Sequence, residues 1–527
     1  LLALSVPFAF FILTIASIGG GIIKTTFFPA ISSDRVQITL RMPQGTDEKI
    51  TDSILQVIED AAVIVGDSLT KEQIGNKPVV ESLIREIGPG SASGQLRVNL
   101  LPGEERDFSA ALIANAIQER VGPVYGIESL EYSSGTNFGG KPVAVSLSGE
   151  NIAELKGAKA ELREALFENP LLKDITDNDP QGIKEIRLKL KDQAYNLGLN
   201  YREVSEQVRS GFFGAEVQRL QRGRDEVKVW VRYDESNRNS IRDLEDMRIQ
   251  TPDGDAVELS EIATYDIERG EVAINHLNGE RQITVSADLK NPKESATDII
   301  ADIRNNVMPT ILARYPTVKP IYEGQNREAS KVSGSARAVL PVVFFLIYAI
   351  IAFTFRSYSQ PILLLLLVPL SMIGVAWGHW LHSFPINILS WLGIIALIGI
   401  MVNDGLVLIG KYNGFLREGM SVQDALVEAG RSRFRAIFLT SLTTIAGLAP
   451  LMFETSRQAQ FLIPMAISIA YGIAVATFLT LFMLPLFLSL SNYLKVGFTW
   501  LLSGKKPARE EVERVIKEKK RLEHEAN

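Results

Sequence analysis

Long apolar stretches on either side of one polar block constrain this sequence more than any other feature. A stretch of about 20 apolar residues predicts a membrane-spanning helix, because backbone amides must be hydrogen-bonded internally where water is excluded. Six stretches meet this test, and Pro385 ends the third before the fourth begins. They are residues 2–23, 338–355, 361–381, 386–409, 436–453 and 461–490. The sequence therefore predicts an α-helical membrane bundle of six transmembrane helices.

The loops between these stretches differ in charge, and this difference predicts the orientation of the chain. Basic residues are concentrated between the fourth and fifth stretches, whereas the next short loop offers only Arg457. Loops rich in Lys and Arg remain in the cytoplasm. The polar block from Ser32 to Lys331 is then extracytoplasmic, and the charged tail from Lys505 is a solvated helix in the cytoplasm. The basic residues are Lys411, Arg417, Arg431, Arg433 and Arg435.

Charge balance and residue types restrict the classes of function. Lys and Arg number 55 against 61 Asp and Glu, the net charge is -6, and no basic stripe with interleaved aromatic residues is present, so nucleic acid is not an expected partner. The chain has no cysteine. The polar block offers only His276 and three methionines as soft ligands, without metal-site spacing. No metal site and no cofactor are therefore predicted. The methionines are Met42, Met247 and Met308.

The polar block repeats a strand, helix, strand pattern. Apolar residues alternate in the strand segments and recur at helical spacing between them. Two such βαβ units in succession are typical of a ferredoxin-like sandwich. A second sandwich begins near Pro142 and is completed only after an insert, in which residues 214–233 predict a projecting strand pair that turns at Gly223. The segments of the first sandwich are 35–41, 47–66, 79–87, 94–101, 107–121 and 127–133.

The predicted fold is thus a helical membrane bundle plus an α+β extracytoplasmic domain. The predicted boundaries are the first membrane helix (1–29), the first sandwich (30–140), the second sandwich (141–181 and 268–330), the insert (182–267), five further membrane helices (331–495) and the tail (496–527).

One carboxyl group, Asp404, lies inside a predicted membrane helix. A charged side chain at the centre of such a helix costs about 2.5–3.5 kcal/mol, so it must face the bundle interior or a wet cavity. A carboxyl group that gains and loses a cationic neighbour can take up a proton on one side of the membrane and release it on the other. Asp404 is therefore a candidate proton-relay residue. The alternative is that it only hydrogen-bonds a neighbouring helix.

Three polar residues share one face of the fifth apolar stretch. Arg433, Thr440 and Thr444 are seven and four residues apart, which places them in line along a helix. Each has a simpler interpretation: Arg433 as a charge that fixes topology, and the threonines as hydroxyl groups bonded to their own helix. His379 and His382 are interpreted as amphipathic residues at the outer interface.

Several short strings occur in a fixed order along the chain: Phe27 to Pro29, Pro43 to Thr46, Gly223 to Asp225, Gly399 to Gly405 and Arg433 to Ser441. In order and spacing these strings resemble the resistance-nodulation-cell division (RND) transporters, over essentially the whole chain. The similarity is to the second half of these proteins, in a hydrophobe/amphiphile-type multidrug branch or a related environmental branch.

This resemblance implies a secondary active transporter rather than an enzyme. Its expected activity is proton-driven efflux of small amphiphilic molecules from the periplasm or the inner membrane of a bacterium. The sandwiches would be porter subdomains, the insert a docking subdomain, and the working unit a homotrimer in the lipid bilayer that joins a periplasmic adaptor and an outer-membrane channel. Residues matching Asn403, Arg433 and Thr440 belong to a relay with two adjacent membrane aspartates of the first half.

Two features depart from that family pattern. Asn403 stands where lysine is common, and Asp404 follows where an amide is common. The chain also starts at Leu1 within apolar sequence, from which we expect an N-terminal half, carrying the paired aspartates, to lie upstream or on another polypeptide.

Other interpretations remain open at this stage. The chain could be a non-pumping scaffold for trimerisation and docking, or a protein-translocation accessory of the same superfamily. A drug pocket should be lined by aromatic residues, but the loop from Gly88 to Gly94 has none. Phe212 and Phe213 are candidates for such a lining, although paired phenylalanines beside glycines are more often local packing.

Overall fold

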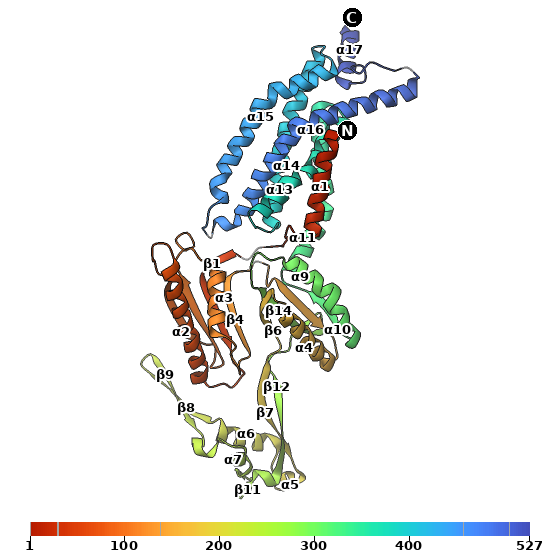
Figure 1. The fold of residues 1–527 in the computed structure, drawn as a ribbon. Coiled ribbons are helices and arrows are strands. Elements are labelled where there is room, and N and C mark those ends of the chain that lie inside the picture. Colours follow the sequence, from red (N-terminus) through yellow and green to blue (C-terminus); the bar gives the residue numbers. More distant parts are fainter. Residues whose placement is uncertain (1, 29–30, 138, 457, 505, 527) are drawn as a thin grey trace. The chain divides into compact units, whose positions relative to one another are not determined.

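Two βα layer pairs, one with a four-stranded and one with a five-stranded sheet, form the region beyond the membrane-type helices (Figure 1). The structure, a computed structural model, describes residues 2–28, 31–137, 139–456, 458–504 and 506–526. Pro29, Arg457 and Lys505, which the sequence analysis used, lie outside these residues. Compact unit 1 comprises Leu1–Met42, Thr46–Asp179 and Ile274–Asn527, and unit 2 comprises Pro43–Gly45 and Pro180–Ala273.

The first layer pair is an antiparallel sheet in the order β2-β3-β1-β4, covered by two helices. Alternate residues of β3 are buried, as expected for a strand with one face on a helix layer. Asp47 and Ser109 cap the helices by accepting hydrogen bonds from backbone N–H groups of the first turn. Its elements are β1 (Ile31–Arg41), α2 (Glu48–Glu72), β2 (Val80–Ile87), β3 (Ser93–Leu100), α3 (Ala110–Val121) and β4 (Ser129–Thr136).

The second layer pair repeats this plan with a long insertion between its second and third main strands. β5 lies between β14 and β15, and β6 pairs with β14. A short π-helix, Ile303–Val307, lies between the helices α9 and α10. The elements are β5 (Val143–Ser148), α4 (Ile152–Glu168), β6 (Leu172–Asp177), β13 (His276–Leu277), β14 (Glu280–Leu289), α9 (Ala296–Asp302), α10 (Met308–Arg314) and β15 (Lys319–Tyr322).

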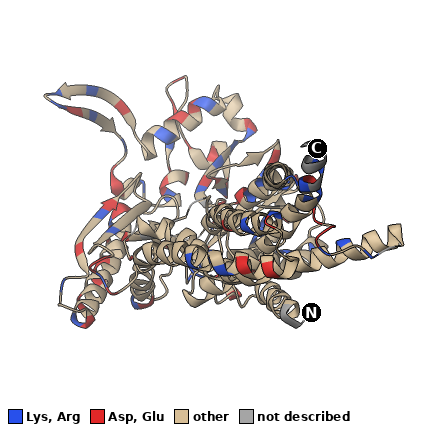
Figure 2. Ribbon diagram, turned by 90° about the horizontal axis from the view of Figure 1, so that it is seen from above, with Lys and Arg blue, Asp and Glu red and all other residues tan. Residues whose placement is uncertain are grey.

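Unit 2 contains the predicted insert. β7 (Gln181–Leu190) and β12 (Ala263–Glu271) form one ribbon, and a Cβ at Gly182 would lie 2.0 Å from the main-chain oxygen of Gly270. β8 (Ala215–Arg222) and β9 (Asp225–Val231) form a second ribbon that turns at Gly223 and carries both signs of charge (Figure 2). Short elements complete the unit: α5 (Asp192–Asn196), α6 (Tyr201–Phe212), α7 (Ile241–Glu245), β10 (Arg248–Gln250), β11 (Ala256–Glu258) and α8 (Leu259–Ile262).

Five described helices are long and apolar enough to cross a membrane. α1 (Leu2–Gly19) is apolar but shorter. Several helices extend beyond the predicted apolar stretches, because hydropathy detects the part that crosses hydrocarbon and not the polar turns that continue the helix. The five are α11 (Gln325–Phe355), the consecutive helices α12 (Ser359–Leu365) and α13 (Leu367–Leu381) counted as one, α14 (Ile388–Arg417), α15 (Val422–Met452) and α16 (Ile463–Ser503).

Glycines bring the helices of this bundle close together. A Cβ at Gly374 of α13 would lie 2.2 Å from the main-chain oxygen of Tyr471 on α16, and one at Gly393 of α14 would lie 2.7 Å from that of Met465. Small residues at helix contacts are what membrane helices use to pack closely, since apolar side chains gain little by leaving lipid. α16 is therefore the element around which α13 and α14 are packed.

The tail contacts the bundle, contrary to the prediction of a merely solvated helix. Before α17 (Arg514–Ala526), Glu513 is only 4% exposed, accepts a hydrogen bond from Asn492 and pairs with Lys495 at 3.1 Å. Sequence alone could not reveal this, because the charge pattern of the tail is the same whether its carboxylates meet water or Lys495.

Candidate functional site

Asp404 lies in the middle of α14. The adjacent residue, Gly405, fixes how this part of the helix is packed. Gly405 is buried, and a Cβ there would lie 2.3 Å from Leu364 of α12, so this face of α14 is held tightly against the bundle. Asn403 is exposed and Asp404 is half-buried. Within the described residues, Asp404 makes no hydrogen bond and no ion pair.

Arg433 and Thr440 lie on α15, beside α14. The Nε atom of Arg433 is buried and has no hydrogen-bond partner in the described part of the chain. The Thr440 hydroxyl donates to its own helix, 3.1 Å from the oxygen of Ala436 and 2.9 Å from that of Ile437, and Thr444 donates to the oxygen of Thr440 at 2.8 Å. Among the described residues, no hydrogen bond or ion pair joins Asp404, Arg433 and Thr440.

Sequence reasoning missed two buried polar pairs in the bundle. The hydroxyl groups of Ser441 and Thr477 lie 2.5 Å apart and link α15 to α16. The side-chain amides of Gln360 and Asn413 exchange two hydrogen bonds of 2.9 and 3.1 Å and link α12 to α14. The sequence position of Ser441 could have indicated the first pair. Ser441 follows Thr440 directly and therefore lies about 100° further round the helix, on the face of α15 that packs against α16.

His379 is not the amphipathic rim residue that the sequence predicted. Its side chain is fully buried, and Nε2 lies 3.0 Å from the hydroxyl of Ser468 on α16. His382 contacts Tyr471 at 3.1 Å. The sequence does not show which helix covers a histidine near the end of an apolar stretch. In this fold α16 covers His379.

Charged side chains join the two βα layer pairs of unit 1. Lys141 donates to Glu131 of β4 at 2.9 Å and to Asp288 of β14 at 2.5 Å, and Asn137 donates to Asp288 at 2.7 Å. Burial disfavours the charged form of Lys141, but Asp288 and Glu131 outweigh that effect and raise the pKa of Lys141 to about 12. Lys141 therefore stays protonated at neutral pH.

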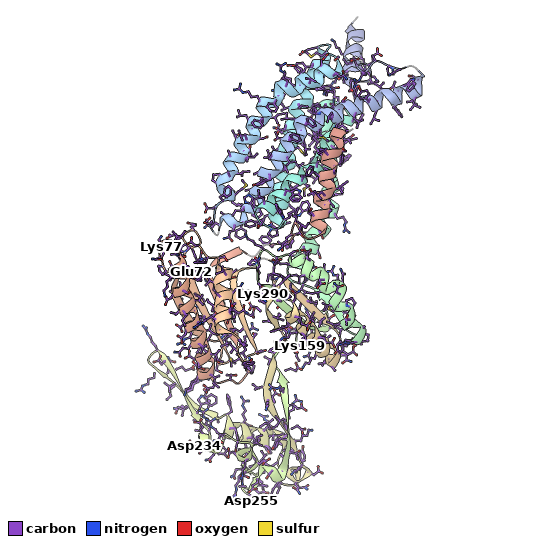
Figure 3. The ribbon with its side chains drawn as sticks, viewed as in Figure 1. Glu72, Lys77, Lys159, Asp234, Asp255 and Lys290 are labelled. Atoms are coloured by element: carbon purple, nitrogen blue, oxygen red, sulfur yellow. The ribbon has the colours of Figure 1, made fainter. Side chains whose placement is uncertain are left out.

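A second contact extends the junction. Lys173 of β6 donates to Asn115 of α3 at 2.8 Å, and Asn115 donates to the main-chain oxygen of Lys290, which Figure 3 labels. Asp174 accepts a hydrogen bond from the backbone N–H of Tyr132 at 3.0 Å, while its other oxygen is buried without a partner in the described residues. Burial raises the pKa of Asp174 to about 6, against the opposing effect of Lys173.

A cavity of about 510 Å³ lies between the loops of the first layer pair and the adjoining ends of the membrane-type helices. Phe108, Phe384 and Phe453 contribute apolar surface, and Arg106 and Glu454 contribute charge. Phe212 and Phe213 do not line it: they pack on Tyr233 and Trp230 of unit 2, at 6.4 and 5.6 Å between ring centres. This mixture of aromatic and charged groups suits an amphiphilic ligand.

Comparison with known proteins identifies the family. Two X-ray crystal structures of a heavy metal efflux pump, in crystal forms II and I, superpose with TM-scores of 0.78 and 0.77 at 20% sequence identity. They match 93% of this chain, and this chain covers 50% and 49% of theirs, so it spans about half the length of those proteins. At this identity the likeness shows the fold. The model of the AcrB/AcrD/AcrF family matches residues 2–492, and the chain therefore belongs to that family of RND transporters, as its sequence strings predicted.

Proposed function

We propose that this chain acts as the C-terminal half of a proton-driven exporter of small amphiphilic molecules. The exporter would be a trimer in the bacterial inner membrane, with its βα layers in the periplasm, joined through an adaptor to an outer-membrane channel. On this proposal α1 is the sixth span: its 18 residues extend about 27 Å, close to the thickness of a hydrocarbon core. The strand orders β2-β3-β1-β4 and β6-β14-β5-β15 support the proposal that these layers are ferredoxin-like porter subdomains.

The observation that carries the proposal is the carboxyl group of Asp404, which has no partner within the described chain although it lies in an apolar helix. A charged group inside a membrane needs a polar partner or a wet cavity, and such groups commonly mark proton pathways. Asn403 beside it is exposed, so this part of α14 is open to further protein. Paired aspartates on another half of the transporter would supply partners that could share or exchange a proton with Asp404.

The test is gradient-driven transport by the complete transporter in proteoliposomes. We expect Asp404→Asn, which keeps the size but cannot release a proton, to lower transport at least 10-fold. Glu418→Gln is the matched control, because Glu418 is exposed at the end of the same helix. Full transport by Asp404→Asn would exclude Asp404 from proton coupling.

The substrate class rests on the 510 Å³ cavity and not on the cargo of the similar structures. Phe453 lines the cavity and is 73% exposed. So large an exposed aromatic surface beside a cavity is expected where a substrate covers it. We expect Phe453→Ala to raise the half-saturating concentration of an amphiphilic substrate by about 10-fold, the loss of one large apolar contact.

Phe353→Ala is the control for this substitution, because Phe353 is 83% exposed on α11 and does not line this cavity. Equal effects of the two substitutions on the half-saturating concentration would contradict a substrate site at the cavity.

The scaffold interpretation is favoured by one observation, the bonding of Thr440 and Thr444 to their own helix. A scaffold would assemble as a trimer but move no solute when a pH gradient is imposed. The proteoliposome experiment with unmodified protein therefore separates the two functions.

A further inference from the structure

A second large cavity, of about 910 Å³, lies at the end of the bundle remote from the βα layers. α11 and α14 both end beside it, and the tail helix α17 forms another wall. Three cations and one carboxylate line it: Arg356, Arg417, Lys519 and Glu518. The cavity therefore carries a net positive charge.

The cations come from three different helices. Arg356 pairs with Glu518 at 2.7 Å, and Lys519 donates to the main-chain oxygen of Arg417 at 2.9 Å. In the described chain no carboxylate lies within ion-pair distance of the Arg417 guanidinium. A helix C-terminus attracts cations, and that effect alone would account for Arg417. The same effect accounts for Lys519, which reaches this helix end from α17, so both cations meet at one side of the cavity.

Arg356 occupies a position where glycine is the usual residue. It ends α11 with a φ of 50°, in the left-handed region that a side chain disfavours. Strained positions of this kind persist where the surrounding structure or a function requires the side chain. Here the side chain of Arg356 lines the cavity.

Glycines form part of the cavity wall on α14. Gly410 and Gly414 line the cavity, and a Cβ at either position would meet nothing within 4 Å. Phe355 of α11 lines the cavity as well, and only 6% of the most apolar segment of α11 is buried. A hydrocarbon chain would fill this space and cover the two glycines.

We propose that this cavity binds an anionic phospholipid, with its phosphate between Arg417, Arg356 and Lys519 and an acyl chain along Gly410 and Gly414. Basic residues at the ends of membrane helices face the headgroups of the cytoplasmic leaflet, whose anionic lipids attract them. Basic pockets between helices on this side are suited to anionic headgroups. Neither the family assignment nor the proposed export function requires this site.

The test measures lipid binding to the purified protein in detergent by native mass spectrometry, with phosphatidylglycerol and phosphatidylcholine as probes. We expect saturable binding of phosphatidylglycerol only. Removing two cations by Arg417→Gln with Lys519→Gln should weaken it by roughly 30-fold. Lys517→Gln is the matched control, because Lys517 is exposed on the same helix and does not line the cavity.

A second variant tests the glycine wall of the cavity without changing charge. Gly414→Leu should weaken phosphatidylglycerol binding while the thermal unfolding midpoint stays within about 2 °C of the unmodified protein. Inorganic phosphate at millimolar concentration should not displace the lipid. Equal binding of both lipids, unchanged binding by the double variant, or displacement by phosphate would each overturn the proposal.

Discussion

At the scale of single residues, the junction of the two βα layer pairs concentrates buried charge. Asp174 is 7% exposed, and its φ of 50° places it in the left-handed region that Asn and Asp tolerate best among residues with side chains. The groups that face it are Lys173 and Asp288 of its own sheet, Lys141, and Tyr132 of the neighbouring sheet. Its ionised form is disfavoured chiefly by burial.

This environment predicts how Asp174→Asn changes stability with pH. The pKa of Asp174 is raised to about 6 in the folded protein, so the folded state ionises less readily than the unfolded chain, whose pKa is near 4. Ionisation of Asp174 at pH 7 therefore lowers the free energy of unfolding. This destabilisation disappears when the pH falls below about 4. Asn suits the backbone and carries no charge. We expect the variant to be more stable than the unmodified protein at pH 7.5, by up to about 3 kcal/mol, and equally stable at pH 4.

Thermal unfolding at the two pH values measures this difference. Asp255→Asn, in the exposed turn labelled in Figure 3, is the control and should show no difference at either pH. A stability difference for Asp174→Asn that is the same at both pH values would contradict the assigned environment.

At the scale of elements, periodicity predicted which segments are strands and helices in the outer block. It could not predict the contacts between them, because Lys141 and Asp288 are 147 residues apart and meet only when the fold brings β14 beside β5. In the bundle, Asp404 was found because a charge interrupts an apolar run. Ser441 and Thr477 were missed because hydroxyl groups are common in membrane helices and their partners depend on packing.

Helix packing in the bundle gives a second prediction. Gly374→Ala places a Cβ against the backbone of Tyr471, which must move away, and overpacking of this kind costs about 1–3 kcal/mol. Gly447→Ala on α15 is the control, since a Cβ there meets nothing within 4 Å and alanine favours helix. Thermal unfolding in detergent should show a lower midpoint for the first and no loss for the second. Equal midpoints would show that α13 and α16 are not in close contact.

At the scale of the whole molecule, the chain spans about half the length of the efflux pumps whose fold it shares. Within the described residues the carboxyl group of Asp404 makes no hydrogen bond and no ion pair, and Asn403 beside it is exposed. On the proposed function, this is where the other half of the transporter would meet α14, and this carboxyl group would take part in moving protons against solute.

The most direct measurement follows protons rather than substrate. Proteoliposomes that contain the complete transporter and an enclosed pH-sensitive dye are given substrate, and the internal pH is recorded. We expect a substrate-dependent proton flux in the unmodified protein and in Glu418→Gln, and its loss in Asp404→Asn. An undiminished proton flux in Asp404→Asn would contradict a role of this carboxyl group in proton coupling.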